Sequence, residues 1–265
     1  MPHPNRPLIP TADSRYQILV TDDGSYSLMD TVLEESYHSG SGAAAESYVV
    51  YLQNSRIASR LRQSDNLPTR VFEYGFGTGM NFIITASLAA AEKQPLLFTS
   101  WEHRLLPGVV FEQLQIPSSI IAAEKLELLH DCSAHARSIT DAFLRFRDEL
   151  GNTPEKGVYR FAYTDDIILE LNIGDATTIS PTALRDSYQS VYFDAFSPKT
   201  NPDLWTEPVL RTAFELLENN GTLVTYCVNS VVRKLVAQCG FKVTKEPGPI
   251  GGKREVLVAI KTPDR

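Results

Sequence analysis

The feature that most constrains this chain is a series of alternate glycines directly after a strand-like segment. The stretch "VFEYGFGTGMNF", Val71 to Phe82, begins with β-branched and aromatic residues and continues through Gly75, Gly77 and Gly79. Glycine weakens the interior of a strand or helix, and it is favoured where the backbone turns tightly or lets another group come close. The stretch therefore predicts a strand, a tight turn and a helix, with something lying close to the turn.

From residue 70 onward, strand-like runs alternate with helical stretches, which indicates a mostly parallel sheet with crossover helices. The predicted fold is α/β and Rossmann-like, and its last two strands suit an antiparallel end. A helical insertion at about 104–157 is too long for a simple crossover. The seven predicted strands are 70–75, 96–102, 167–174, 190–196, 221–228, 241–246 and 254–261, and the clearest predicted helices are 81–93, 206–220 and 230–240.

The N-terminal part follows a different pattern. Apolar runs on both sides of Asp23-Gly24 predict a hairpin, and a second hairpin is predicted to turn at 164–166. Helix-like spacing follows from Tyr48 to Leu61. We expect a flexible leader over 1–15, a hairpin and helix packing on the core over 16–69, and an α/β domain over 70–265.

Composition excludes several classes of protein. No run among the 265 residues approaches the ~20 apolar residues that span a bilayer, and "MPHPNRPLIP" lacks the apolar stretch of a signal peptide, so a cytoplasmic protein is expected. The three cysteines, Cys132, Cys227 and Cys239, and the histidines show no metal-ligand spacing, and no metal is expected. Acidic residues outnumber basic ones by 32 to 25, so a nucleic-acid partner would need a local basic patch.

The glycine turn departs from a dinucleotide-binding turn, because Met80 stands where G-x-G-x-x-G has its third glycine. The pattern E-x-G-x-G-x-G fits the amino-acid portion of S-adenosylmethionine, whose ammonium can be held by backbone carbonyls and a nearby acid. A turn needed only for close packing remains the alternative. The candidate cofactor contacts here are Glu73, Gly75, Gly77, Thr78, Gly79 and Asn81.

Acids also follow the next predicted strands. Glu102 lies 23 positions beyond Gly79 (102 − 79), close to the offset at which a carboxylate receives ribose hydroxyls, although a solvated surface glutamate is the alternative. Asp175, with Ala176 beside it, could meet an adenine amino group. Together with Glu73 and Asp194, these acids are predicted at the carboxyl ends of neighbouring strands, where open α/β sheets bind ligands.

The stretch "VYFDAFSPKTNPDLW" predicts that Asp194 lies at the end of a strand and that a stiff loop with two prolines follows it. Stiff loops at strand ends hold reacting groups in place. Asp194 is the candidate catalytic residue, Phe196, Pro198 and Lys199 are candidate substrate contacts, and Trp205 is expected to pack under the next helix.

A local basic patch lies between Arg233 and Arg254, a segment that contains six basic residues and a single acid, Glu246. Its glycine-rich segment "GPIGGKR" contains Lys253 and Arg254, which are candidate contacts for phosphates. A solvated hairpin whose charges bind nothing is the alternative.

These stretches resemble a known family. "EYGFGTGMNF", "FDAFSPKTNPDLW" and "GPIGGKREVLVA" look like the methyltransferase domain of MnmC-type tRNA modification enzymes, and "DDGSYSLMD" with "AESYVVYLQ" resembles that family's N-terminal elements. The resemblance runs from about Val20 to Lys261. It implies a seven-stranded S-adenosylmethionine methyltransferase fold.

The resemblance also implies a reaction, which is methylation of the exocyclic amine of 5-aminomethyl-2-thiouridine at the tRNA wobble position. In the family's well-known form, a fused flavin-dependent oxidase removes a carboxymethyl group. The resemblance therefore implies a stand-alone methyltransferase here, with a separate enzyme supplying the aminomethyl group. Asp194 would orient the amine by hydrogen bonds and accept the proton released on transfer.

Three other functions remain open at this point. An NAD-dependent oxidoreductase shares the sheet, but Met80 counts against it. A polyamine aminopropyltransferase also joins an adenosyl sulfonium to an amine acceptor, and the basic patch alone argues against it. A non-catalytic RNA-binding module could retain the same cavity.

Overall fold

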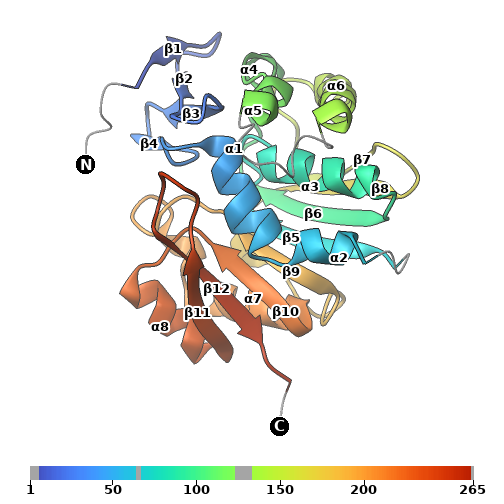
Figure 1. Cartoon of the computed structure of the whole chain (residues 1–265), viewed down its shortest axis with the longest axis vertical. Coiled ribbons are helices and arrows are strands. Elements are labelled where there is room, and N and C mark those ends of the chain that lie inside the picture. Colours follow the sequence, from blue (N-terminus) through green and yellow to red (C-terminus); the bar gives the residue numbers. More distant parts are fainter. Residues whose placement is uncertain (1–5, 64–66, 123–132, 264–265) are drawn as a thin grey trace.

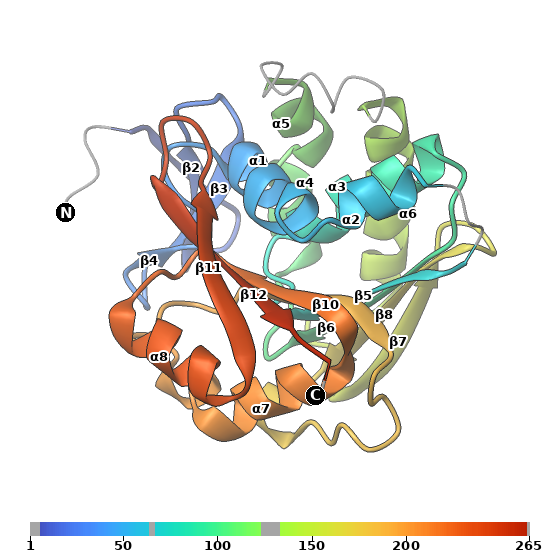
Figure 2. The same ribbon diagram turned by 60° about the horizontal axis from the view of Figure 1, so that its bottom comes forward.

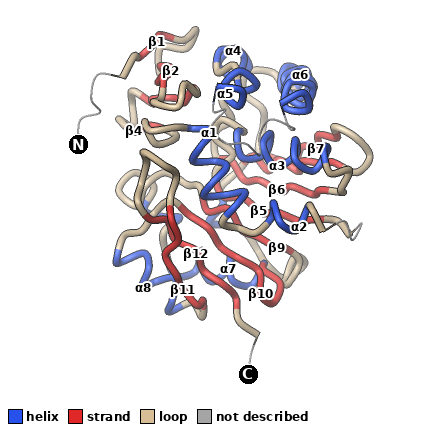
Figure 3. The backbone as a smooth tube through the Cα atoms, viewed as in Figure 1, coloured by secondary structure: helices blue, strands red, loops and turns tan. Residues whose placement is uncertain are grey.

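The computed structural model describes residues 6–63, 67–122 and 133–263. Its eight-stranded sheet has the order β11-β12-β10-β9-β5-β6-β8-β7 (Figures 1 and 3). The five strands from β10 to β8 in this order run parallel, while β12 and β7 are each antiparallel to their neighbours. The strands are β5 (Thr69–Tyr74), β6 (Leu96–Glu102), β7 (Gly157–Ala162), β8 (Ile167–Ile173), β9 (Tyr188–Phe193), β10 (Leu217–Thr225), β11 (Phe241–Pro247) and β12 (Glu255–Lys261).

This sheet confirms the predicted α/β fold with an antiparallel end. The eighth strand is β7, which pairs with β8 through the second predicted hairpin. A parallel sheet needs helices on both faces, so its strands carry apolar residues on both sides. In β5, Val71 belongs to one buried cluster and its neighbour Phe72 to the other.

Helices cover both faces of the sheet (Figure 2). Side chains of α7 and α8 belong to the same buried cluster as Phe72. Side chains of α3, α4, α5 and α6 belong to the same cluster as Val71. The predicted insertion at 104–157 contains α4, α5 and α6, and α6 packs on α3. The helices are α1 (Ala43–Glu46), η1 (Ser47–Gln53), α2 (Ile57–Leu61), α3 (Met80–Ala91), α4 (Gly108–Gln113), α5 (Ile116–Ala122), α6 (Ser133–Glu149), η3 (Ala176–Thr178), η4 (Pro202–Leu204), α7 (Glu207–Leu216) and α8 (Ser230–Gln238).

The glycine series forms the turn between β5 and α3, as the sequence predicts. Gly75, Gly77 and Gly79 all have positive φ angles, of 91°, 52° and 72°. A Cβ atom on Gly75 would lie 2.7 Å from the carbonyl oxygen of Asp194, so the turn passes very close to the end of β9. The glycines thus bring the ends of two neighbouring strands together.

The predicted helix over 206–220 is too long. Helix α7 ends at Leu216, and the next residues already belong to β10. Leu216 and Leu217 are both fully buried, and the register of β10 against β9 shifts between Leu217 and Thr222. Asn220, which has a φ of 68°, and Gly221 therefore lie at an irregularity within the strand.

A small antiparallel sheet precedes the α/β core. Its strands β1 (Leu8–Pro10), β2 (Tyr16–Val20), β3 (Tyr26–Asp30) and β4 (Glu35–Ser36) pair in chain order, and β2 with β3 is the predicted hairpin. The predicted flexible leader over 1–15 is wrong for its described part, because β1 pairs with the open edge of β2 and Arg6 forms an ion pair with Asp22 at 2.7 Å. None of the described helices combines the length and apolar character that crossing a membrane requires.

Candidate functional site

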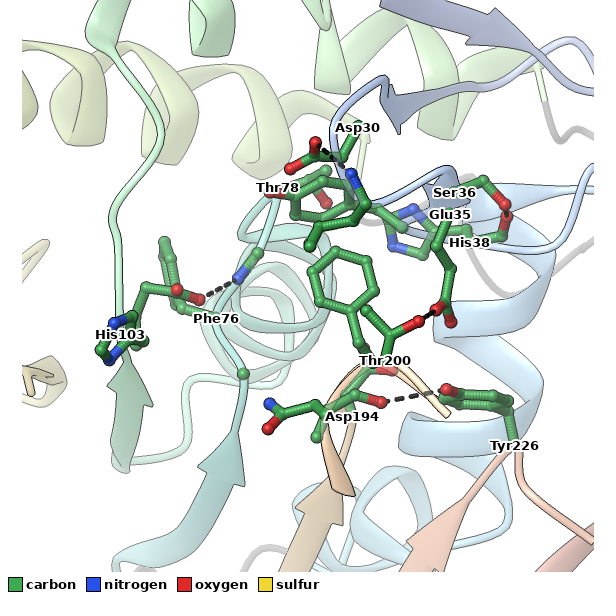
Figure 4. Close-up of a pocket in the computed structure, with 18 of the residues that line it drawn as sticks. Asp30, Glu35, Ser36, His38, Phe76, Thr78, His103, Asp194, Thr200 and Tyr226 are labelled. Atoms are coloured by element: carbon green, nitrogen blue, oxygen red, sulfur yellow. Dashed lines mark hydrogen bonds between the residues drawn. The ribbon is translucent and has the colours of Figure 1, made fainter. Parts of the chain in front are cut away.

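A cavity of about 1010 Å³ lies at the carboxyl ends of β5, β6, β8 and β9. The glycine turn and the strand ends form one side, and residues of the small N-terminal sheet and the loop after β4 form the other (Figure 4). Lys253, from the loop between β11 and β12, also reaches the cavity. The predicted residues that line it are Gly75, Gly77, Thr78, Asn81, Glu102, Asp175, Ala176, Asp194, Phe196 and Lys253.

Asp194 is held in place by two hydrogen bonds. The Tyr51 hydroxyl donates to its Oδ1 at 2.5 Å, and Nδ2 of Asn81 donates to its Oδ2 at 2.8 Å. Burial raises the pKa of Asp194 well above its ordinary value, while these two donors act in the opposite direction. The carboxylate therefore has a fixed orientation at the cavity wall.

Glu73 lies beneath the cavity and does not line it. Its side chain is fully buried and accepts hydrogen bonds from Asn81 Nδ2 at 2.9 Å and from the Ser100 hydroxyl at 2.6 Å. Burial raises its pKa well above the ordinary value. Its position does not fit the predicted direct cofactor contact, and it instead orients Asn81, which in turn holds Asp194.

Glu102 is the last residue of β6, which neighbours β5, and Asp175 follows β8, the next strand in the sheet. The Glu102 carboxylate accepts from the Gly77 amide at 3.0 Å and from the Arg104 amide at 2.8 Å, so it ties the glycine turn to β6. Asp175 accepts from the Thr177 amide at 2.9 Å, and this bond lowers its pKa. Both acids line the cavity.

Two buried polar atoms at the cavity wall lack a partner within the described residues. They are Oδ1 of Asn81 and Oγ1 of Thr78, on side chains that are 4% and 2% exposed. A buried polar atom without a hydrogen bond is costly, and a ligand can satisfy it. These atoms, the positive-φ glycines and the acids at the strand ends fit the amino-acid and nucleoside portions of S-adenosylmethionine.

The loop after β9 is as firmly held as the sequence suggested. The Tyr226 hydroxyl donates to the Ala195 carbonyl at 3.0 Å, and Nε1 of Trp205 donates to the Phe196 carbonyl at 2.8 Å. Trp205 is 7% exposed, so it has the expected packing role. Phe196 packs edge-on against Tyr37 at 4.9 Å between ring centroids.

Glu35 of β4 fixes the same loop from the N-terminal side. It accepts from the Ser197 amide at 3.0 Å and also from the Thr200 hydroxyl. Sequence reasoning missed this residue and the other N-terminal groups at the cavity, because no local pattern links them to strand ends far along the chain. The missed residues that line the cavity include Asp30, Glu35, Tyr37 and Glu46, and Tyr226 after β10. Tyr51, which donates to Asp194, was missed as well.

Several predicted substrate contacts lie away from the cavity wall. Pro198, Lys199 and Arg254 do not line it, and neither does Gly79, which precedes α3 at the turn. Lys253 does line it, with Nζ lying 4.0 Å from the centroid of the Tyr226 ring. In the basic patch, Lys245 forms an ion pair with Glu255 at 2.6 Å.

Comparisons with known proteins agree with this geometry. Residues 145–262 match a family described as S-adenosyl-L-methionine-dependent methyltransferase. The bifunctional protein for tRNA 5-methylaminomethyl-2-thiouridine biosynthesis, MnmC, is 28% identical over 93% of this chain in Burkholderia thailandensis and 30% identical over 87% in Paraburkholderia phymatum. The matched regions cover 35% and 33% of those two proteins, so this chain spans about a third of their length.

A solved structure is similar as well. The crystal structure of MnmC2 from Aquifex aeolicus superposes with a TM-score of 0.66 at 25% identity, and it covers 95% of this chain and 72% of the other.

Proposed function

We propose that this chain, which is similar to the S-adenosyl-L-methionine-dependent methyltransferases of the MnmC type, methylates the exocyclic amine of 5-aminomethyluridine or 5-aminomethyl-2-thiouridine at the tRNA wobble position. The observation that carries the proposal is the position of Asp194. Its carboxylate is oriented by Tyr51 and Asn81 at the wall of a cavity whose opposite end suits an adenosyl cofactor. A tRNA substrate also agrees with the expected cytoplasmic location.

The cofactor would be held by the glycine turn and by the acids at the strand ends. Gly75, Gly77, Thr78 and Asn81 would contact its amino-acid portion, Glu102 would receive the ribose hydroxyls, and Asp175 with Ala176 would meet the adenine. When bound, S-adenosylmethionine supplies an electrophilic methyl group on a sulfonium. The protein's task is to present a neutral amine in line with that methyl group.

Asp194 would hold the amine by hydrogen bonds. An alkylammonium titrates near ~10 in water, and a negative charge beside it would raise that value further. Asp194 therefore contributes orientation, which the bonds from Tyr51 and Asn81 make rigid. Phe196 lies beside it at the cavity and would contact the base.

The tRNA backbone would meet the basic groups around the cavity mouth. Lys253 lines the cavity, and Arg254 and Lys199 are exposed. Phosphate contacts of this kind position a nucleic acid without reading its sequence. The aminomethyl group would come from a separate enzyme.

The alternatives have less support. Met80 begins helix α3 where a dinucleotide-binding turn has its third glycine, which disfavours an NAD-dependent oxidoreductase. Neither an aminopropyltransferase nor a non-catalytic RNA-binding module is favoured by the comparisons.

The proposal is tested by methyl transfer from labelled S-adenosylmethionine to two tRNA preparations, one carrying 5-aminomethyluridine and one carrying 5-carboxymethylaminomethyluridine. We expect label in the first tRNA, located at the wobble nucleoside, and none in the second. Calorimetric titration with S-adenosylmethionine should show binding without tRNA. Binding without transfer would leave the cofactor site intact and reject the acceptor.

A further inference from the structure

Glu46 is a buried carboxylate at the cavity wall that the mechanism above does not use. It is the last residue of α1, it is 4% exposed, and it lines the same cavity as Asp194. Within the described residues, its carboxylate accepts a hydrogen bond from the Ser39 amide at the long distance of 3.4 Å. A buried carboxylate is costly unless it is paired and well hydrogen-bonded, so this position suits a cationic partner.

The groups around Glu46 indicate where that partner would lie. Burial raises the pKa values of Asp194, Tyr51 and Tyr226, and the negative charge of Glu46 raises them further. Glu46, Asp194 and Tyr226 line the same cavity. Lys253 approaches from the β11–β12 loop with its ammonium over the Tyr226 ring. Carboxylates beside the face of an aromatic ring form a favourable environment for an alkylammonium.

The two carboxylates differ in how their oxygens are used. Both oxygens of Asp194 already accept a strong hydrogen bond, from Tyr51 and from Asn81, and such bonds fix and stabilise the anion. Glu46 has no comparable donor among the described residues, and burial raises its pKa to about 7. Burial raises the pKa of both carboxyl groups, so the difference between them lies in their hydrogen bonds. Asp194, with both oxygens engaged, is suited to orient an amine, and the less engaged oxygens of Glu46 are open to take a proton.

We propose that Glu46 is the second carboxylate of the acceptor subsite, and that it binds the substrate's primary ammonium beside Asp194 and removes its proton. This inference rests on the proposed function, because it assumes an amine acceptor. The proton passes from the ammonium nitrogen to a Glu46 oxygen, and the nitrogen lone pair then forms the new C–N bond. The methyl–sulfur bond breaks with its electron pair remaining on sulfur, and the product is a secondary ammonium. Glu46 afterwards releases its proton to water.

Binding of two anticodon stem-loops tests the recognition step without turnover. The stem-loops carry 5-aminomethyluridine or 5-hydroxymethyluridine, and the protein is saturated with S-adenosylhomocysteine. We expect the wild type to prefer the amine by roughly tenfold or more, as for loss of a charge-assisted contact. Glu46→Gln should abolish the preference, and Glu112→Gln, which removes an exposed acid on α4 away from the cavity, should retain it. Equal binding of the two stem-loops by the wild type, including no binding of either, would overturn the inference.

The pH dependence of transfer tests the proton step. The titratable groups that face Glu46 are Asp194, Tyr51 and Tyr226 together with Lys253, and all four remain in Glu46→Gln. At pH 7 the variant should lose on the order of 100-fold in kcat/KM, the usual contribution of a general base. The loss should shrink to within tenfold near pH 10, because the amine then loses its proton in solution. A loss that is equal at every pH would indicate a purely structural role.

The two proposals fail in distinguishable ways. A wild type that prefers the amine stem-loop through Glu46 but transfers no methyl group would reject the proposed function and leave the role of Glu46 in binding. A wild type that methylates the tRNA while Glu46→Gln matches it in both experiments would reject the inference alone.

Discussion

The Tyr51 hydroxyl lies 2.5 Å from Oδ1 of Asp194, although 143 residues separate the two along the chain. Tyr51 belongs to η1, a π-helical segment in which Asn54 donates its amide to the carbonyl of Val49, five residues earlier. Short π-helical segments occur frequently at functional sites. Tyr51 follows Glu46 by five positions, which is the i→i+5 spacing of a π-helix. Both residues reach the surroundings of Asp194.

Replacing Tyr51 by phenylalanine removes this hydrogen bond while keeping the ring. A hydrogen bond to a charged group contributes about 1.5–3 kcal/mol, so we expect kcat to fall roughly tenfold or more. The affinity for S-adenosylmethionine should stay within about twofold of the parent. Steady-state kinetics and calorimetry measure the two quantities. Tyr159→Phe is the matched control, because Tyr159 donates to the Glu155 carbonyl on an exposed part of the fold, and an equal loss in both variants would refute the assignment.

Gly75→Ala should destabilise the fold by about 2 kcal/mol or more. The φ angle of Gly75 is 91°, and an added Cβ would lie 2.7 Å from the Asp194 carbonyl oxygen, which is backbone and cannot easily move. Gly151→Ala is the control, since Gly151 has a φ of 72° but nothing within 4 Å of an added Cβ. That variant should lose only about 1 kcal/mol from its backbone conformation. Urea denaturation compares the two, and equal losses would show that the close approach to Asp194 has no energetic weight.

Replacing Lys253 and Arg254 together by alanine should weaken tRNA binding and flatten its dependence on salt. Each lost phosphate contact lowers the slope of log K against log salt by about 0.7–0.9. The affinity for S-adenosylmethionine should not change. Binding isotherms between 50 and 200 mM salt, roughly the range over which such effects are large, provide the measurement. Lys245→Ala is the control on the same hairpin, because Lys245 is paired with Glu255.

The free energy of unfolding should depend on pH because Glu46 is buried. Its folded-state pKa of about 7 lies above the ordinary value, so the folded protein binds the proton more tightly than the unfolded chain. Stability from this group is present at low pH and is lost as pH rises from about 4.5 to about 7. His38, whose pKa burial lowers from 6.5 to about 4, acts in the opposite direction between those two pH values, a range that overlaps the window of Glu46.

The difference between wild type and Glu46→Gln cancels the contribution of His38. We expect the variant to gain stability relative to the wild type by about 3 kcal/mol between pH 4.5 and pH 7.5, since one pKa unit corresponds to about 1.4 kcal/mol. Chemical denaturation at several pH values measures this. A difference that does not vary with pH would mean that Glu46 is not desolvated in the folded protein.

Local sequence patterns predicted the part of the site that lies at strand ends. Glu102, Asp175 and Asp194 each follow an apolar run, and parallel strands place their carboxyl ends at one edge, so their convergence follows from the strand pattern alone. Glu73 precedes the turn within β5, and its full burial depends on neighbouring strands, which no local pattern describes.

The other half of the site could not be predicted in this way. The spacing of Tyr51 is that of an apolar helix face and indicates packing, whereas its hydroxyl reaches Asp194 only through the tertiary fold. Glu35 reaches the loop after β9 from a two-residue strand. Strand β1 depends on the unpaired edge of β2, because its own residues are proline-rich and exposed. Each of these features arises from pairing between distant segments.

The most direct test of the account is the single-turnover rate of methyl transfer to tRNA carrying 5-aminomethyluridine by the wild type and by Asp194→Ala, with S-adenosylmethionine affinity measured in parallel. The account predicts transfer by the wild type, a loss of about 100-fold or more in the variant, and cofactor affinity within about threefold. Transfer by Asp194→Ala within tenfold of the wild type would contradict it.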